Sequence, residues 1–211
     1  MVAIAGLATA LIVQESRWRS EAAEGPANLQ IAKQEFRAGD EKNALALFQK
    51  LAAANDPAAQ YWVGHMTELG IGIPRDVSKA IALYQEAAVR NNVAAQVRLG
   101  EIYLHGDLVP SDFTKAKGYL ERAANIGNAR AALLLGQMYR LGLGMPANPK
   151  EACIWSEVST IEGNALARHE RDALMPILNA DDQKAVSTQA RAILASITEA
   201  TKARHSQSAL T

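Results

Sequence analysis

The residues of this sequence that could do chemistry are a glycine-rich loop, four histidines and one cysteine. The loop reads Gly-Ile-Gly-Ile-Pro-Arg-Asp over residues 70–76 and precedes a helical pattern. Many proteins hold phosphate in such a loop, where free backbone amides open a helix. A nucleotide site of that kind needs a strand before the loop and a Gly-Lys-Ser/Thr sequence after it. Both are missing here, so no nucleotide cofactor is expected.

The histidines and the cysteine also lack the spacing of a site. His65, His105, His169 and His205 form no His-x-x-x-His pair and no carboxylate cluster with ligand spacing. No Gly-x-Ser-x-Gly sequence marks a serine nucleophile. Cys153 stands alone, so it cannot form an intramolecular disulfide and is expected to pack as a small apolar side chain. We therefore expect no catalytic residue, no metal ligand and no cofactor.

The elements that carry these residues repeat every 36 positions. Loops of the same kind begin at Gly70, Gly106 and Gly142. The same step relates further positions, namely Ala59, Ala95, Ala131 and Ala167, and the pairs Lys79-Ala80, Lys115-Ala116 and Glu151-Ala152. Self-similarity at a period of 20 to 50 residues indicates a solenoid, in which each unit buries its apolar face against its neighbours. The loop at 70–76 is therefore predicted to be a turn between two helices.

Each unit is predicted to contain two helices. Residues 95–105 place small and apolar side chains on one helical face, and Gly106 ends this helix as a C-cap. Asp112 then supplies the N-cap of a second helix from Phe113 to Asn125, as Asp76 and Asn148 do in their units. Strand-length segments with alternating hydrophobicity are absent, so the chain is predicted to be all-α.

A glycine inside the first helix of each unit requires an explanation, because mid-helix glycine costs about 1 kcal/mol relative to alanine. The glycines concerned are Gly64, Gly100 and Gly136. Their recurrence predicts that a large side chain of the neighbouring helix packs directly on the backbone there. The register expected to supply it is Leu83, Tyr119 and Trp155.

The two ends of the chain depart from the 36-residue unit. A shorter relative of the repeat occupies residues 27–56, and full repeats occupy about 57–92, 93–128 and 129–164. A cap is predicted over 165–202. It contains a first-type helix from Asn164 to Met175 and a final helix from Gln183 to about Lys202, capped by Asp181 and Asp182, as the end of a solenoid requires. Residues 203–211 are predicted to form a tail.

The N-terminal segment, residues 1–24, bears on location. Met1–Val13 carries no charge, but thirteen helical residues span only about 20 Å, against about 30 Å of hydrocarbon in a bilayer. The length suits the apolar region of a signal peptide, although a basic start and a cleavage site directly after it are missing. Three interpretations stay open: an export signal, a membrane anchor that starts upstream, and a buried helix. The first two are favoured, so a periplasmic or inner-membrane-anchored protein is expected, with membrane contact through residues 1–13.

Composition limits the partners. Lys and Arg together number 22, equal to Asp and Glu, so the chain has no net field that would attract nucleic acid. With 49% apolar and 21% charged residues the chain is typical of a globular protein. Nucleic-acid binding is therefore not expected.

These residues resemble the Sel1-like repeat, a relative of the tetratricopeptide repeat. The pattern Ala-x-x-x-Leu-Gly-x-x-Tyr-x-x-Gly, followed by Asp-x-x-Lys-Ala and a closing Ala-Ala-x-x-Gly, is matched almost in full at 95–127 and 131–163 and more loosely at 59–91. The segment from Ala167 to Leu194 also resembles the C-terminal cap of exported bacterial Sel1 proteins. The resemblance implies a right-handed α-solenoid of helix-turn-helix repeats, with a concave groove lined by the first helices. The cysteine-rich branch of the family is excluded by the lone Cys153.

Positions that differ between repeats are candidates for partner binding. Residues three apart on the first helix share one face, so three such positions in three repeats could line the groove. They are Trp62, Arg98 and Leu134, then His65, Glu101 and Gln137, then Glu68, Leu104 and Arg140. Tryptophan and arginine are enriched at interface hot spots. Alternatively, Trp62 packs against the preceding short repeat.

The function implied by the resemblance is that of a non-catalytic adaptor or scaffold, which binds a protein or peptide in its groove in the bacterial envelope. Bacterial relatives act in periplasmic signalling, envelope assembly, host interaction or neutralisation of secreted toxins. Two alternatives follow: an immunity protein that blocks a secreted enzyme, and a docking subunit of a membrane assembly.

Overall fold

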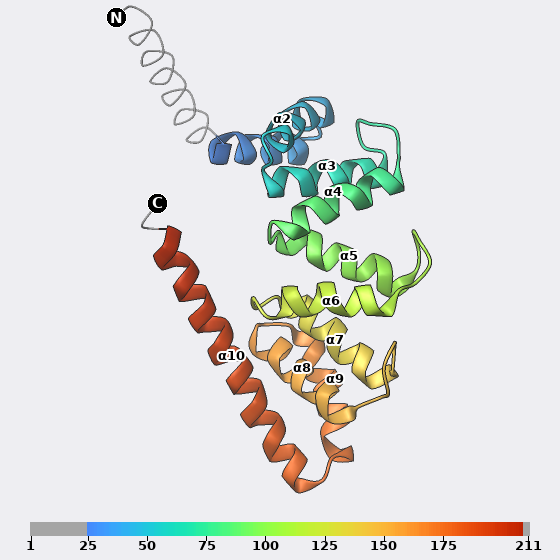
Figure 1. Ribbon diagram of the computed structural model, residues 1–211, viewed down its shortest axis with the longest axis vertical. Coiled ribbons are helices and arrows are strands. Elements are labelled where there is room, and N and C mark those ends of the chain that lie inside the picture. The colour runs from blue at the N-terminus through green and yellow to red at the C-terminus, as the bar shows by residue number, and fades with distance from the viewer. Residues whose placement is uncertain (1–24, 209–211) are drawn as a thin grey trace, which may run out of the picture. The chain divides into compact units, whose positions relative to one another are not determined.

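The computed structural model describes residues 25–208, and these form an all-α repeat fold without a strand (Figure 1). A first helix covers residues 25–38. The helices that follow are α2 (Glu41–Ala53), α3 (Pro57–Leu69), α4 (Val77–Val89), α5 (Val93–His105), α6 (Phe113–Ala124), α7 (Ala129–Leu141), α8 (Pro149–Ile161), α9 (Ala165–Leu174), the 3₁₀ turn η1 (Met175–Ile177) and α10 (Ala180–Ser208). The expected all-α repeat fold is confirmed.

The uncharged segment Met1–Val13, for which a signal or an anchor is predicted, lies outside the described residues. Within residues 25–208, none of the helices combines the length and the hydrophobicity that crossing a bilayer requires.

The chain divides into two compact units after Asn92. Unit 1 contains the helix over 25–38 and α2 to α4, and unit 2 contains α5 to α10. In each unit the two helices of a repeat lie side by side: α3 contacts α4, α5 contacts α6, and α7 contacts α8. The division therefore falls at the boundary between two repeats.

The turns and caps of the repeats have the chemistry that the sequence predicts. Gly70 and Gly142 end α3 and α7 in the left-handed region, at φ 74° and 69°, which glycine adopts without a steric penalty. Asp112 accepts a hydrogen bond from the backbone N–H of Lys115 at 3.0 Å. Asp76 and Asn148 make the same bond in their repeats, at 2.9 Å and 3.1 Å.

The N-cap of α6 is expected to add a pH-dependent contribution to stability. Hydrogen bonds from the Lys115 backbone and side chain hold the pKa of Asp112 below its usual 3.8. A lowered pKa in the folded state stabilises the protein above pH 3.8, and this contribution is lost as the pH falls through the folded-state value. Asp112→Asn, which copies the neutral cap at position 148, is expected to unfold at a temperature that changes less between pH 6 and pH 3 than that of the wild type. Thermal unfolding followed by circular dichroism measures this, and parallel pH profiles would contradict it.

The interior glycines are in close contact with the neighbouring helix, but the register of their partners differs from the prediction by one residue. A Cβ at Gly64 would lie 2.9 Å from the Tyr84 ring, at Gly100 2.5 Å from Leu120, and at Gly136 3.0 Å from Ser156. The expected partners Leu83, Tyr119 and Trp155 are therefore wrong. Consecutive helical residues point about 100° apart, so only one of them can face the glycine. In α6 that residue is the fully buried Leu120, and Tyr119 stacks on Tyr103 instead.

The final helix of the C-terminal cap begins earlier and ends later than the sequence predicts. Asn179, not Asp181 or Asp182, caps α10: its side-chain oxygen accepts the backbone N–H of Asp182 at 2.8 Å. The helix runs from Ala180 to Ser208 instead of 183–202, so residues 203–208 are not part of a tail. No glycine or proline interrupts this segment, which lets the helix continue after its packed face ends.

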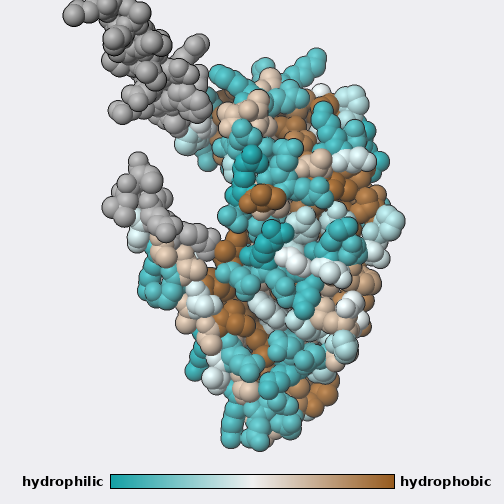
Figure 2. All heavy atoms as spheres, in the orientation of Figure 1, coloured by the Kyte–Doolittle hydropathy of each residue, from teal (hydrophilic) through white to brown (hydrophobic). Residues whose placement is uncertain are grey.

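The cap helix closes unit 2 by covering the end of the repeat core. Figure 1 shows α10 running back past α8, and the two helices are in contact. Val186 and Ala190 are fully buried, and Ile197 reaches the turn at Gly127. Lys150 of α8 also pairs with Asp182 at 2.9 Å. Figure 2 shows apolar residues gathered in a strip on the surface beside α10.

Candidate functional site

In unit 2 the first helices of two successive repeats, α5 and α7, and the first helix of the cap, α9, bring charged side chains together. On α5, Arg98 and Glu101 form an ion pair at 3.3 Å. Glu101 also accepts a hydrogen bond at 2.7 Å from Nε of Arg130, which lies at the start of α7. The carboxylate of Glu101 is therefore held by two guanidinium groups, and its side chain is only 15% exposed.

A second cluster joins α7 to α9 in a similar way. The carboxylate of Glu170 on α9 lies 3.1 Å from Nε of Arg140. It also accepts a hydrogen bond of 3.3 Å from the side-chain amide of Gln137. Two donors from α7 thus hold one carboxylate of the next repeat, as two arginines hold Glu101.

These six side chains form a partly exposed surface, which we call the charged face: Arg98, Glu101, Arg130, Gln137, Arg140 and Glu170. Along these first helices, some repeat positions keep the same residue and others change it. Ala95, Ala131 and Ala167 are identical and fully buried. Three residues after each alanine the side chain changes from Arg98 to Leu134 to Glu170. The alanine position is thus constant, whereas the side chain three residues later differs in each helix, and of these Arg98 and Glu170 are partly exposed.

The other residues predicted for the groove are placed differently. Trp62 is half-buried in the core of unit 1, where its ring stacks on Phe48 with centroids 5.3 Å apart and planes at 4°. His65 stacks on Tyr61. Glu68 is 4% exposed and accepts a hydrogen bond from the Tyr84 hydroxyl at 2.8 Å.

In unit 2, Leu134 is buried, with 4% exposure. Of the predicted residues, the structure brings together Arg98 with Glu101, and Gln137 with Arg140. Their role in binding a partner stays a prediction, as does that of Trp62, His65, Glu68 and Leu134.

Two members of the charged face, Arg130 and Glu170, are missing from the sequence prediction. Glu170 lies one more step of 36 residues beyond Trp62, Arg98 and Leu134, so extending that series into the cap would have found it. Arg130 lies four residues before Leu134, hence on the same side of α7. No pattern within one helix could have indicated that both residues pair with carboxylate or amide groups of another repeat.

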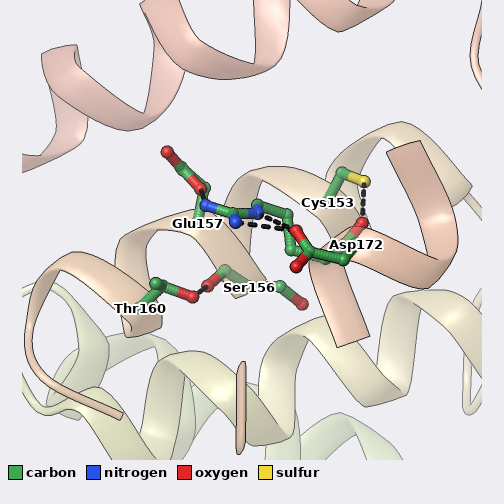
Figure 3. Close-up of polar contacts among 6 residues, drawn as sticks. Cys153, Ser156, Glu157, Thr160 and Asp172 are labelled. Carbon is green, nitrogen blue, oxygen red and sulfur yellow. Dashed lines mark hydrogen bonds and ion pairs between the residues drawn. The ribbon is translucent and has the colours of Figure 1, made fainter. Parts of the chain in front are cut away.

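The histidine, cysteine and acidic side chains of the described residues do not gather into a metal-binding group. Among residues 25–208, no group of three or more histidine, cysteine or acidic side chains converges on a point that could hold a metal ion. Cys153 is fully buried, as expected, and its thiol lies 3.8 Å from the backbone oxygen of Arg171. Figure 3 shows the surroundings of Cys153, with Glu157 on α8 and Asp172 on α9. Both carboxylates accept hydrogen bonds from the Arg171 guanidinium. The hydrogen bond between Arg171 and Glu157 links α9 to α8.

The thiol of Cys153 is expected to be unreactive until unit 2 opens. Burial raises its pKa to about 11, so at pH 8 only about one thiol in a thousand is ionised. We expect the native protein to resist a thiol-specific disulfide reagent at pH 8, and one equivalent of thiol to react in denaturing urea. Absorbance of the released chromophore measures both. Complete labelling of the native protein within seconds would contradict the buried placement.

Comparison with known proteins places the repeats in a family. The model of the Sel1 repeat matches residues 36–56, 57–92, 93–128 and 129–159. The structure is similar to the crystal structure of a Sel1 repeat protein from Oxalobacter formigenes, with 24% identity and a TM-score of 0.68 over 79% of this chain and 72% of that one. It is also similar to a protective antigen of uropathogenic Escherichia coli with the same type of repeat, with 25% identity and a TM-score of 0.69. That match covers 87% of this chain and 40% of the other.

A more distant match is an immunity protein from Pseudomonas aeruginosa, 16% identical with a TM-score of 0.38 over 82% of each chain, which is too low to support an inference about function. Comparison with curated proteins gives no significant match.

Proposed function

The chain belongs to the Sel1 repeat family, and from this premise we propose that it is a non-catalytic adaptor that binds a protein through the charged face of α5, α7 and α9. Sel1 repeats are generally protein-interaction modules, and proteins built from them are generally scaffolds without catalytic activity. Assigning the binding to the charged face, and the adaptor role to this chain, is our proposal.

The observation that carries the proposal is that α5, α7 and the cap helix α9 hold polar side chains of unit 2 in fixed positions through contacts with one another. A charged side chain on an isolated helix samples many rotamers, and ordering it on binding costs about 0.5 to 1.5 kcal/mol. In the charged face, one contact within α5, at 3.3 Å, and three contacts between helices, at 2.7 to 3.3 Å, already restrict this freedom. A partner that meets these groups loses less entropy, so a pre-ordered polar surface favours specific association.

We place the protein in the bacterial envelope, on the strength of the uncharged segment Met1–Val13. Cell fractionation with sequencing of the mature N-terminus tests this. A shortened chain in the periplasm supports export, and an intact chain retained in membranes after a high-salt wash supports an anchored docking subunit. An intact chain in the cytosolic fraction would contradict both.

Site-specific photo-crosslinking in cells of the native host tests the binding surface. A benzophenone amino acid at the exposed position Ala94, one turn before Arg98 on α5, would face a partner on the charged face. The matched control is the exposed Gly118 on α6, where an added side chain meets nothing within 4 Å. We expect one protein, identified by mass spectrometry, to crosslink at position 94 and not at 118, and the purified protein to reproduce the adduct in vitro.

Charge reversal connects the adduct to the face. Arg130→Glu together with Arg140→Glu is expected to abolish the crosslink at position 94, while helical circular dichroism is unchanged, because both side chains are substantially exposed. A partner captured at position 118 instead, or an adduct at 94 that survives the reversal, would refute the proposed surface.

A further inference from the structure

We propose that the partner segment bound by the charged face is an acidic, extended peptide, whose two carboxylates are received by the terminal guanidinium nitrogens of Arg130 and Arg140. This inference rests on the proposed function and specifies the chemistry of the partner. It starts from the way these two arginines are held.

Among residues 25–208, each of the two arginines is held through its inner nitrogen alone. Nε of Arg130 bonds Glu101 at 2.7 Å, and Nε of Arg140 lies 3.1 Å from Glu170. Among the described residues, no carboxylate, carbonyl or hydroxyl is recorded on their outer Nη1 and Nη2 atoms. The two side chains are 57% and 38% exposed. The free end of each guanidinium is thus a planar pair of N–H donors, the geometry that matches a carboxylate with two parallel hydrogen bonds.

The carboxylates of Glu101 and Glu170 orient these N–H donors without fully neutralising the positive charge of the charged face. Glu101 is also bound by Arg98, and Glu170 by Gln137, so neither is free to swing with its arginine. The charged face carries three arginines and two glutamates, which leaves an excess of one positive charge. An incoming carboxylate therefore meets a net attractive field, together with two pre-oriented donors.

The distance between the two arginines indicates the shape of the ligand. They are ten residues apart on α7, so their Cα atoms are separated by about 15 Å along the helix axis. An extended peptide advances about 3.3 Å per residue, and two acidic residues four or five positions apart span the same distance. Adjacent acidic residues would reach only one of the two.

Nucleic acid is disfavoured by the same side chains. A phosphate backbone presents a negative charge every few ångströms, and such a chain crossing this face would pass the carboxylates of Glu101 and Glu170. The chain as a whole has no excess of basic residues, since 22 Lys and Arg face 22 Asp and Glu. Two separated carboxylates on a peptide can meet the arginines and avoid these glutamates.

Fluorescence anisotropy with the full chain and synthetic peptides tests the proposal. The probe is a labelled ten-residue Gly/Ser/Thr peptide with two glutamates four positions apart. One control peptide has glutamine at both positions, and a second has the two glutamates adjacent. At about 50 mM salt we expect the spaced-glutamate probe to bind about tenfold more tightly than either control, and this difference to shrink at 300 mM salt because screening weakens exposed ion pairs.

Variants locate the contact. Arg130→Gln and Arg140→Gln are each expected to weaken binding of the spaced-glutamate probe about tenfold, as loss of a charge-assisted hydrogen-bond pair predicts. Arg122→Gln is the matched control: this exposed arginine of α6 stacks over the Tyr119 ring at 4.9 Å and should be replaceable without effect. Equal affinity for the glutamate and glutamine probes, or an equal loss in Arg122→Gln, would overturn the proposal.

The outcome separates this inference from the proposed function. If a protein crosslinks at position 94 but the spaced-glutamate probe shows no advantage, the charged face binds its partner by other chemistry, and only the inference is wrong. If neither the crosslink nor the probe is observed, the proposed function is also wrong. Tighter binding of a single-stranded oligonucleotide than of the acidic probe would likewise refute the peptide assignment.

Discussion

Replacing Trp62 with alanine is expected to lower the free energy of unfolding of unit 1 by about 3 kcal/mol. The indole stacks on Phe48 and lies against Phe36, with ring centroids 5.3 Å and 5.2 Å apart. Removing such a ring from a core typically costs 3 to 5 kcal/mol, and the partial exposure of Trp62 places this site at the lower end. Urea denaturation followed by far-ultraviolet circular dichroism measures the loss.

Trp62→Phe is the control, because it keeps an aromatic ring between the same neighbours and is expected to cost less than half as much. A Trp62→Ala protein with unchanged stability would contradict the core assignment and would favour the interpretation of Trp62 as an interface residue. A binding experiment that uses Trp62→Ala must therefore first show that unit 1 is still folded.

The second large effect is expected at Gly100, where alanine should destabilise unit 2 by about 2 kcal/mol. Alanine would gain about 1 kcal/mol in helix propensity, but its Cβ would lie 2.5 Å and 2.6 Å from two carbons of Leu120. Overpacking costs about 1 to 3 kcal/mol, and the full burial of Leu120 with two contacts this short places Gly100→Ala at the upper end, which leaves a net loss of about 2 kcal/mol. Urea denaturation of wild type and variant gives the difference.

Two comparisons make the result at Gly100 specific. Gly118→Ala, on the exposed side of α6 with nothing within 4 Å, is expected to stabilise the protein by about 0.5 to 1 kcal/mol. In a Leu120→Ala background, Gly100→Ala should become neutral or stabilising, because the clashing atoms are gone. Destabilisation of similar size in that background would show that the helix backbone, not Leu120, requires glycine.

Local chemistry made the repeat architecture predictable. A helix, its caps and its turns depend on residues within a few positions of one another, so the pairs Asp112 with Lys115 and Gly70 with its turn could be identified without knowledge of the fold. Because the sequence repeats every 36 residues, each of these local signals occurs again in the next repeat. The last helix follows no repeat, and its bounds were predicted less accurately: Asn179 caps α10, and the helix continues to Ser208.

The charged face could be predicted only in part. Helical spacing grouped Arg98 with Glu101, which pair within one helix at 3.3 Å. The bond of Glu101 to Arg130, 29 residues away, depends on how closely α5 and α7 approach each other, which no local pattern reports. For the same reason the register that meets the interior glycines was misjudged by one residue: a rotation of about 100° on a helix changes the partner completely.

The sequence by itself determined that this protein is an all-α chain of Sel1-type repeats without a recognisable catalytic motif, because periodicity, caps and turn glycines are short-range properties repeated in phase. The tertiary structure alone decided which side chains are available on the surface. It placed Trp62 within the core of unit 1, buried Leu134 and Glu68, and fixed Arg130 and Arg140 by carboxylates from other repeats. Such contacts depend on the packing angle and separation of helices, which arise from the summed burial of many side chains.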